Sequence, residues 1–165
     1  MLVINLFGGP GSGKSTIATG LFSMLKMPPS KLKIELFLEP FKHECYYKNH
    51  QLINFSDQLI DLYDKLTIIL PQLDIAITDC PVELAKYYDP SNKIFEKYTF
   101  PALNIKINRV KPYIQNGRRQ SEIEAKDIDQ RLSVFTYNYT INGDQNGLNQ
   151  LYNIVLKEIN KKLDK

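Results

Sequence analysis

The sequence predicts an α/β fold, in which a five-stranded parallel sheet lies between two layers of helices. Apolar runs of strand length alternate with longer segments whose apolar residues recur at helical spacing. A glycine-rich loop separates the first predicted strand from the first predicted helix. The chain has 165 residues, and its 43% of hydrophobic residues can form a buried core. We therefore expect a single domain over residues 1–165.

The elements follow from these patterns in chain order. Predicted strands cover Leu2–Phe7, Lys33–Leu38, Leu73–Thr78, Leu103–Asn108 and Tyr137–Ile141. Predicted helices cover Gly13–Lys26, Phe55–Leu70, Val82–Tyr88, Ser121–Phe135, which opens with a capping box, and Leu148–Leu163. The segment Phe41–Asn49 is a short helix or a loop. The fourth strand alternates apolar and polar residues, so we expect one of its faces to be poorly covered or functional.

The loop between the first strand and the first helix is a phosphate-binding loop. Residues 8–15 read Gly-Gly-Pro-Gly-Ser-Gly-Lys-Ser and match G-x-x-x-x-G-K-[ST] at every fixed position. Its glycines let backbone N–H groups converge on an anion, and the next helix points its N-terminal dipole at that anion. We expect Lys14 to reach the β- and γ-phosphates and Ser15 to ligate Mg²⁺. The predicted binding residues for the cofactors ATP and Mg²⁺ are Gly8, Gly9, Gly11, Ser12, Gly13, Lys14, Ser15 and Thr16.

Two carboxylates follow other strands, where ligands of parallel sheets bind. Asp79 follows the third strand and is expected to hold Mg²⁺, directly or through its water, opposite Ser15. Glu39 follows the second strand, where it can bind an acceptor hydroxyl and take its proton. An ordinary turn aspartate and an acid at a helix N-terminus are the respective alternatives.

A basic segment, Arg109–Gln120, follows the fourth strand. Arginines that close over a transferred phosphoryl group can neutralise its charge, and a segment with proline and glycine can swing shut as a lid. A solvated basic loop is the alternative. The predicted catalytic arginines are Arg109, Arg118 and Arg119, with Arg109 and Arg118 ranked first.

The acceptor pocket is expected to draw on residues 41–58. Gln58 can pair with a base or a sugar through its amide, and Phe41 can stack on a base. A polar first-turn residue and a core or surface aromatic are the alternatives. His43 and His50 fit no common zinc spacing.

The location is expected to be the cytoplasm. Cys45 and Cys80 form no C-x-x-C pair and are expected to be reduced thiols. No apolar run approaches the ~18 residues of a membrane span, and the N-terminus lacks the features of a signal peptide.

Taken together, these residues resemble the P-loop nucleoside and nucleotide kinase group. Glu39-Pro40 resembles the Glu-Pro of deoxynucleoside kinases, in which that Glu acts as the base. Thr78–Pro81 lies where those kinases and thymidylate kinases carry an acidic residue followed by Arg, whereas this chain has Cys80 in place of the Arg. Asn108–Asp129 resembles the lid and following helix of small bacteriophage proteins labelled as AAA-type ATPases or nicotinamide-riboside-kinase-like proteins. A phage-encoded chain would act in the host cytoplasm.

The leading interpretation is an ATP- and Mg²⁺-dependent phosphotransferase that acts on a hydroxyl or phosphate of a nucleoside, nucleotide or similar small molecule. A kinase for a DNA or polynucleotide hydroxyl and a nucleotide-dependent ATPase or switch module stay open as alternatives. The net charge of +3 gives little support to nucleic-acid binding. The expected partners are ATP and a nucleoside- or nucleotide-like acceptor, with no membrane, and a homodimer is left open.

Overall fold

The computed structural model describes residues 1–39, 55–87, 93–114 and 120–163. Its centre is a five-stranded sheet, in which all strands are parallel and lie in the order β2-β3-β1-β4-β5. The strands are β1 (Leu2–Phe7), β2 (Ile34–Phe37), β3 (Ile75–Thr78), β4 (Ala102–Asn108) and β5 (Tyr139–Asn142). The predicted parallel sheet is therefore confirmed.

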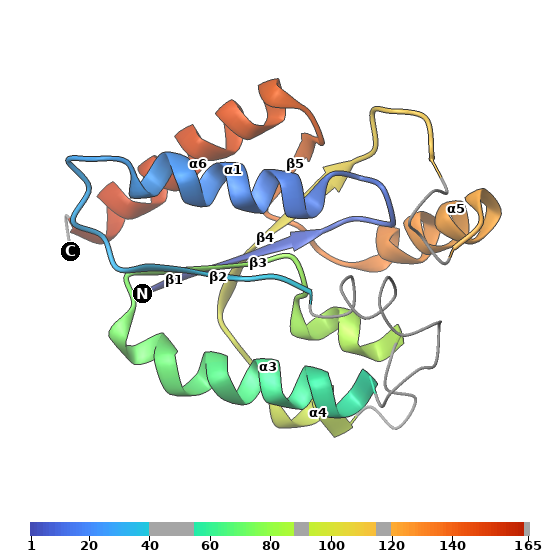
Figure 1. Ribbon diagram of the computed structural model, residues 1–165, viewed down its shortest axis with the longest axis horizontal. Coiled ribbons are helices and arrows are strands. Elements are labelled where there is room, and N and C mark those ends of the chain that lie inside the picture. Colours follow the sequence, from blue (N-terminus) through green and yellow to red (C-terminus); the bar gives the residue numbers. More distant parts are fainter. Residues whose placement is uncertain (40–54, 88–92, 115–119, 164–165) are drawn as a thin grey trace.

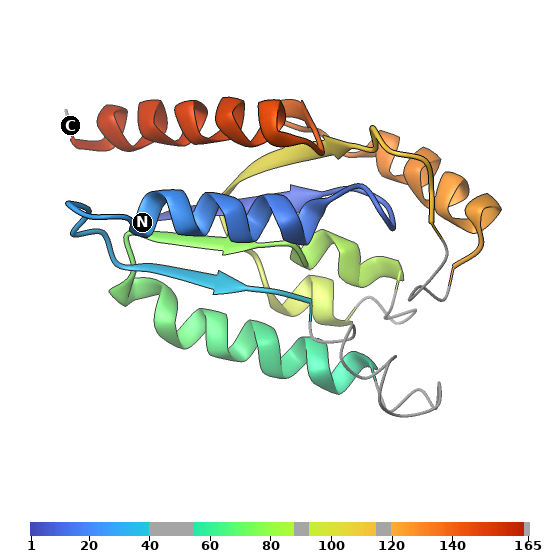
Figure 2. The same cartoon turned by 45° about the horizontal axis from the view of Figure 1, so that its top comes forward.

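Helices cover both faces of this sheet. The α-helices are α1 (Lys14–Lys26), α3 (Phe55–Ile69), α4 (Lys93–Lys97), α5 (Glu122–Arg131) and α6 (Gln145–Leu163). The 3-10 helices of the described residues are η1 (Leu70–Gln72), η2 (Val82–Tyr87) and η3 (Leu132–Val134). Figures 1 and 2 show α1 and α6 on one face and α3 with α4 on the other, while α5 lies beyond the carboxyl end of the sheet. The predicted three-layer arrangement is thus confirmed.

The central strand β1 is buried along its whole length, which explains its unbroken apolar run. Ile4 and Leu6 belong to the core cluster that includes α1 and α6. Val3 points to the opposite face and packs with Leu66 of α3 and Leu70. Because β1 is held from both faces, its carboxyl end gives the phosphate loop a fixed starting point.

Two helix boundaries differ from the sequence prediction by three residues or more. The last helix begins at Gln145 rather than Leu148, because Asp144 Oδ1 accepts a hydrogen bond of 2.8 Å from the Gly147 N–H and caps it. The predicted capping box of Ser121 is confirmed, but its helix ends at Arg131. There the chain tightens into η3, in which the Leu132 carbonyl accepts from the Phe135 N–H.

Smaller differences concern the third strand and the segments around it. This strand begins at Ile75 rather than Leu73, because the Leu73 N–H closes the preceding 3-10 turn on the Leu70 carbonyl. The short helix after it is a 3-10 helix, and α4 had no predicted counterpart. The segment Phe41–Asn49 lies outside the described residues.

The polar face of β4 is covered by the chain that leads into β5. Asn104 Oδ1 accepts a hydrogen bond of 3.0 Å from the amide of Asn5, which is almost fully buried on β1. The Asn104 N–H donates to Asn138 Oδ1 at 2.8 Å. Lys106 Nζ lies 5.7 Å from the centre of the Tyr137 ring. Paired polar groups therefore explain why this strand alternates although it is not at the sheet edge.

Candidate active site at the carboxyl end of the sheet

The phosphate loop joins β1 to α1 in a backbone conformation that only glycine adopts easily. Gly11 and Gly13 have φ angles of 76° and 95°, in the left-handed region. Gly8 is restricted by space instead, since a Cβ there would lie 2.4 Å from the Ser12 hydroxyl oxygen. The two fixed glycines of the motif are thus required for different physical reasons, lack of space at Gly8 and a left-handed backbone at Gly13.

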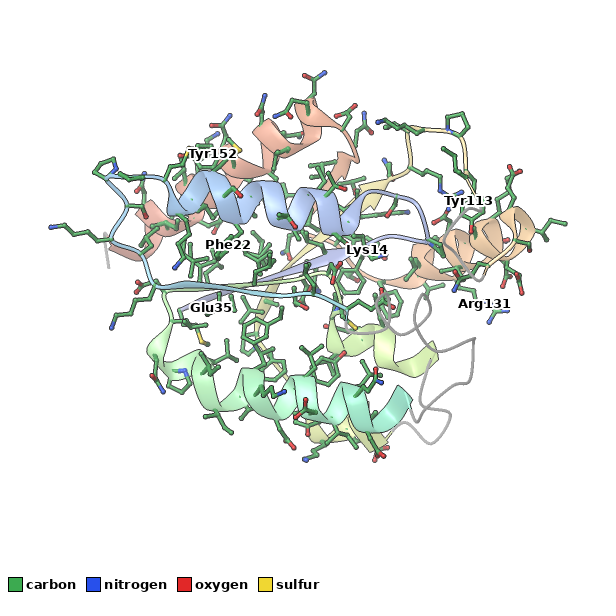
Figure 3. All side chains as sticks on the ribbon, viewed as in Figure 1. Lys14, Phe22, Glu35, Tyr113, Arg131 and Tyr152 are labelled. Atoms are coloured by element: carbon green, nitrogen blue, oxygen red, sulfur yellow. The ribbon has the colours of Figure 1, made fainter. Side chains whose placement is uncertain are left out.

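Lys14 begins α1 and reaches back over this loop. Its ammonium donates a hydrogen bond of 2.6 Å to the Gly8 carbonyl, at the start of the loop. Figure 3 shows Lys14 near the N-terminal end of α1 and the carboxyl end of the sheet. The cation is thus held against the first residue of the glycine-rich loop.

Asp79 follows β3 and contacts the last residue of the glycine-rich motif. The Ser15 hydroxyl donates a hydrogen bond to Asp79 Oδ2, and the Glu39 N–H donates one to Asp79 Oδ1 at 2.7 Å. Only 1% of Asp79 is exposed. This buried carboxylate therefore joins the phosphate loop, the end of β3 and the end of β2, and it brings three predicted site residues together.

Cys80 follows Asp79 and lies in a buried, negatively charged environment. Burial raises the pKa of its thiol far above the usual range, and the neighbouring Glu39 carboxylate raises that pKa further. Tyr63 of α3 donates its hydroxyl proton toward the backbone carbonyls of Cys80 at 3.1 Å and Pro81 at 3.2 Å. The Cys80 thiol is therefore neutral, and the backbone carbonyls of Cys80 and Pro81 help to hold α3 against the segment after β3.

Gln58 lies in the first turn of α3, and Figure 1 shows that end of α3 on the side where the strands end. Its Oε1 is buried and has no hydrogen-bond partner among the residues that the structure describes. Phe41, the other predicted acceptor contact, lies outside the described residues.

Arg109 directly follows β4 and is held in an ion pair. One of its terminal nitrogens lies 2.6 Å from Asp129 Oδ2 of α5, and its side chain is only 12% exposed. The guanidinium also lies 5.3 Å from the centre of the Tyr113 ring. Arg118 and Arg119 lie outside the described residues, so the predicted arginines are not seen together.

Two residues that contact the loop were not predicted as site residues from the sequence. Asp129 Oδ1 accepts a hydrogen bond of 3.1 Å from the Gly9 N–H, across 120 residues of sequence. Gly143, between β5 and α6, lies so close to the phosphate loop that an added Cβ would be 1.9 Å from the Ser12 carbonyl oxygen. In the sequence, residues 142–144 (Asn-Gly-Asp) form a turn signal directly after the fifth predicted strand, and this position alone indicates the carboxyl end of the sheet.

Within the described ranges, no group of three or more His, Cys, Asp or Glu side chains could hold a metal ion. His43 and His50 lie outside those ranges. Among the described helices, none is both long enough and apolar enough to span a membrane.

Two solved structures resemble the chain over nearly its whole length. A proposed kinase from Chloroflexus aurantiacus aligns with a TM-score of 0.59 at 16% identity, covering 97% of this chain and 96% of that one. The tunicamycin resistance protein of Deinococcus radiodurans aligns with a TM-score of 0.57 at 12% identity, covering 96% of this chain and 95% of that one. No family model matches the chain, and no curated protein sequence is significantly similar to it. The comparisons therefore show the fold alone, an α/β fold with a parallel sheet.

Proposed function

We propose that the chain is an ATP- and Mg²⁺-dependent phosphotransferase that moves the γ-phosphoryl group to a hydroxyl or phosphate of a nucleoside, nucleotide or similar small molecule. The observation that carries this proposal is the position of Asp79. It contacts the phosphate-loop hydroxyl of Ser15 with one oxygen and the backbone of Glu39 with the other. A donor half and an acceptor half are thus joined by one buried carboxylate.

The donor half consists of the phosphate loop and the groups around it. The loop amides and Lys14 would bind the triphosphate. Ser15 and Asp79 supply a hydroxyl and a carboxylate oxygen, the ligand types that Mg²⁺ prefers, so the donor set fits this ion. When bound, Mg²⁺ supplies charge neutralisation at the phosphates.

The acceptor half is built around Glu39. Its backbone is fixed by Asp79, and its carboxylate is proposed to orient the acceptor and remove the proton of a hydroxyl acceptor. Gln58 Oε1, which has no hydrogen-bond partner within the described ranges, would accept a hydrogen bond from an N–H or O–H group of the acceptor. Phe41 is proposed to stack on a base, and Arg109, Arg118 and Arg119 are proposed to neutralise charge on the transferred group.

The structural relatives support this choice of chemistry. One is described as a proposed kinase and the other as a tunicamycin resistance protein, and both align with almost the whole chain. In-line phosphoryl transfer needs mainly positioning and charge neutralisation, and the residues proposed for this site are of the kinds that supply both.

A screen with ATP labelled at the γ-phosphate tests the proposal. Purified protein with Mg²⁺ is incubated with nucleosides, nucleotides and nicotinamide riboside, and labelled products are separated from released phosphate. We expect one acceptor class to be labelled by the wild type and by Lys26→Ala, but not by Lys14→Ala. Lys26 is a suitable control because it lies in the last turn of the same helix. Hydrolysis at the same rate with and without every acceptor would overturn the proposal in favour of an ATPase or switch module.

A further inference from the structure

Asp129 is the one acidic side chain of α5 that the described contacts connect to the phosphate loop. Its Oδ1 accepts the 3.1 Å hydrogen bond from the Gly9 N–H, and its Oδ2 pairs with Arg109 at 2.6 Å. The two carboxylate oxygens thus have different partners on different elements. The loop after β1, the end of β4 and the last turn of α5 meet at this single side chain.

The backbone at Gly9 lies close to α5. A Cβ on Gly9 would lie 2.0 Å from Asp129 Oδ1 and 3.3 Å from the Ala125 carbonyl oxygen. Ala125 itself is fully buried, one turn before Asp129 on the same helix. The glycine at position 9 therefore allows α5 to approach the phosphate loop closely. The motif itself does not require a glycine at this position.

Arg109 extends this set of contacts to both ends of the basic segment. Its guanidinium lies over the Tyr113 ring, and Figure 3 shows Tyr113 beside α5. The Tyr113 hydroxyl donates a hydrogen bond of 2.5 Å to the Gln120 carbonyl, just before the capping box of α5. A continuous series of contacts thus runs from Gly9 through Asp129, Arg109 and Tyr113 to Gln120.

The charges in this series explain how a carboxylate can lie beside an anion-binding loop. Alone, the negative charge of Asp129 would repel a bound triphosphate. Paired with Arg109, whose side chain is mostly buried, it adds no net charge at short range. Its Oδ1 still accepts a hydrogen bond from a loop amide, and this bond is charge-assisted because the acceptor is a carboxylate.

We propose that Asp129 is a positioning residue of the nucleotide site, which fixes the first turn of the phosphate loop and the guanidinium of Arg109 relative to each other. This inference rests on the proposed nucleotide binding. Asp129 acts through Gly9 and Arg109 and makes no contact with the reacting atoms in this role.

Asp129→Ala removes both contacts and should weaken the binding of Mg·ATP about tenfold, as expected for one charge-assisted hydrogen bond. Asp129→Asn keeps an acceptor for Gly9 but loses the ion pair, so its affinity should fall between those of Asp129→Ala and the wild type. Asp127→Ala is the matched control, because Asp127 pairs with Arg131 on the exposed face of the same helix. Its affinity should stay within about twofold of the wild type.

The measurements are calorimetric titration with Mg·ATP and hydrogen exchange of the Gly9 amide. The proposal predicts faster exchange of the Gly9 amide in Asp129→Ala and protection close to the wild type in Asp129→Asn. If Asp129 had only a structural role, Asp129→Ala would lower thermal stability without selectively exposing this amide. If Asp129→Ala does not fold, Gly9→Ala serves instead, since its new methyl group displaces the carboxylate. Gly9→Ala should then also weaken the binding of Mg·ATP, and an unchanged affinity would overturn the positioning role.

The outcomes separate this inference from the proposed function. If the wild type binds no Mg·ATP, both fail. If the wild type binds Mg·ATP and Asp129→Ala binds it equally well, only the positioning role fails. Tighter binding by Asp129→Ala would also overturn it, because the carboxylate would then compete with the nucleotide rather than order the loop.

Discussion

The hydroxyl of Ser15 donates a hydrogen bond to Asp79, and this contact connects the start of α1 to the end of β3 across 64 residues of sequence. It exists because β1 and β3 are neighbouring parallel strands, paired from Leu2 with Ile75 to Asn5 with Thr78. The segments after both strands therefore leave the sheet at the same edge. In the proposed function the Mg²⁺ ligands are adjacent for this reason.

Asp79→Asn should lower Mg²⁺-dependent turnover about a hundredfold and raise the Mg²⁺ concentration needed for half-maximal rate. The amide has no charge and only one oxygen, whereas the carboxylate accepts from both Ser15 and the Glu39 N–H. Metal titrations of initial rates measure the effect. Asp74→Asn is the control, because Asp74 precedes β3 at the opposite edge and accepts from the Lys33 N–H. An unchanged Mg²⁺ dependence in Asp79→Asn would remove this residue from the metal site.

Glu39→Gln should reduce phosphoryl transfer to a hydroxyl acceptor about a hundredfold while leaving ATP affinity within about twofold. Asp79 contacts the backbone of Glu39 rather than its side chain, so this substitution leaves that hydrogen bond in place. Single-turnover rates and ATP titrations separate the two effects. Glu35→Gln is the control, at an exposed position of β2, the strand that precedes Glu39. Wild-type transfer by Glu39→Gln would show that another group takes the proton.

Most of the fold could be predicted because it depends on local patterns. The strand Leu2–Phe7 matches β1 residue for residue, and the helix after it differs by one residue. The juxtaposition of Ser15 and Asp79 followed from a general rule, that parallel strands end at one edge. The boundary errors arose where side chains override periodicity, as at the Asp144 cap.

The missed contacts depend on tertiary structure alone. Nothing near Asp129 in the sequence indicates that its carboxylate would meet the Gly9 N–H, because the position of α5 over the loop is set by packing. Arg109 was predicted from its place after a strand, but its ion pair with Asp129 depends on the same packing. Such contacts between distant segments leave no periodic signal.

The Cys80 thiol should make folding stability fall at alkaline pH. Burial raises the pKa of this thiol in the folded state well above its usual value of 9.0, and the nearby Glu39 and Asp79 carboxylates raise it further. The unfolded chain therefore loses this proton first. The stabilising contribution is complete below pH 9.0 and is lost as the pH rises above it.

Urea unfolding of Cys45→Ala between about pH 8 and 10 measures this effect, because Cys80 is then the single thiol. The free energy of unfolding should decrease more steeply in Cys45→Ala than in Cys45→Ala/Cys80→Ala. The folded single-thiol variant should also react with a disulfide reagent only after denaturant is added. Rapid reaction of the folded variant near neutral pH would contradict the raised pKa.

Gly143→Ala should weaken nucleotide binding although residue 143 lies far from the phosphate loop in sequence. Its new Cβ would lie 1.9 Å from the Ser12 carbonyl oxygen and 3.2 Å from the Asn108 carbonyl oxygen, both of which are backbone atoms that yield little. Overpacking of this kind costs about 1–3 kcal/mol, and the shift needed to relieve it would displace the phosphate loop.

Gly20→Ala is the matched control for this prediction. There the new Cβ would lie 2.6 Å from a terminal methyl carbon of Leu148, a flexible side chain that can move, and α1 gains a better helix former. Titration with Mg·ATP should therefore show wild-type affinity for Gly20→Ala and an affinity about tenfold lower for Gly143→Ala. Circular dichroism should show that both variants are folded. Equal affinities in the two variants would mean that the β5–α6 turn does not support the phosphate loop.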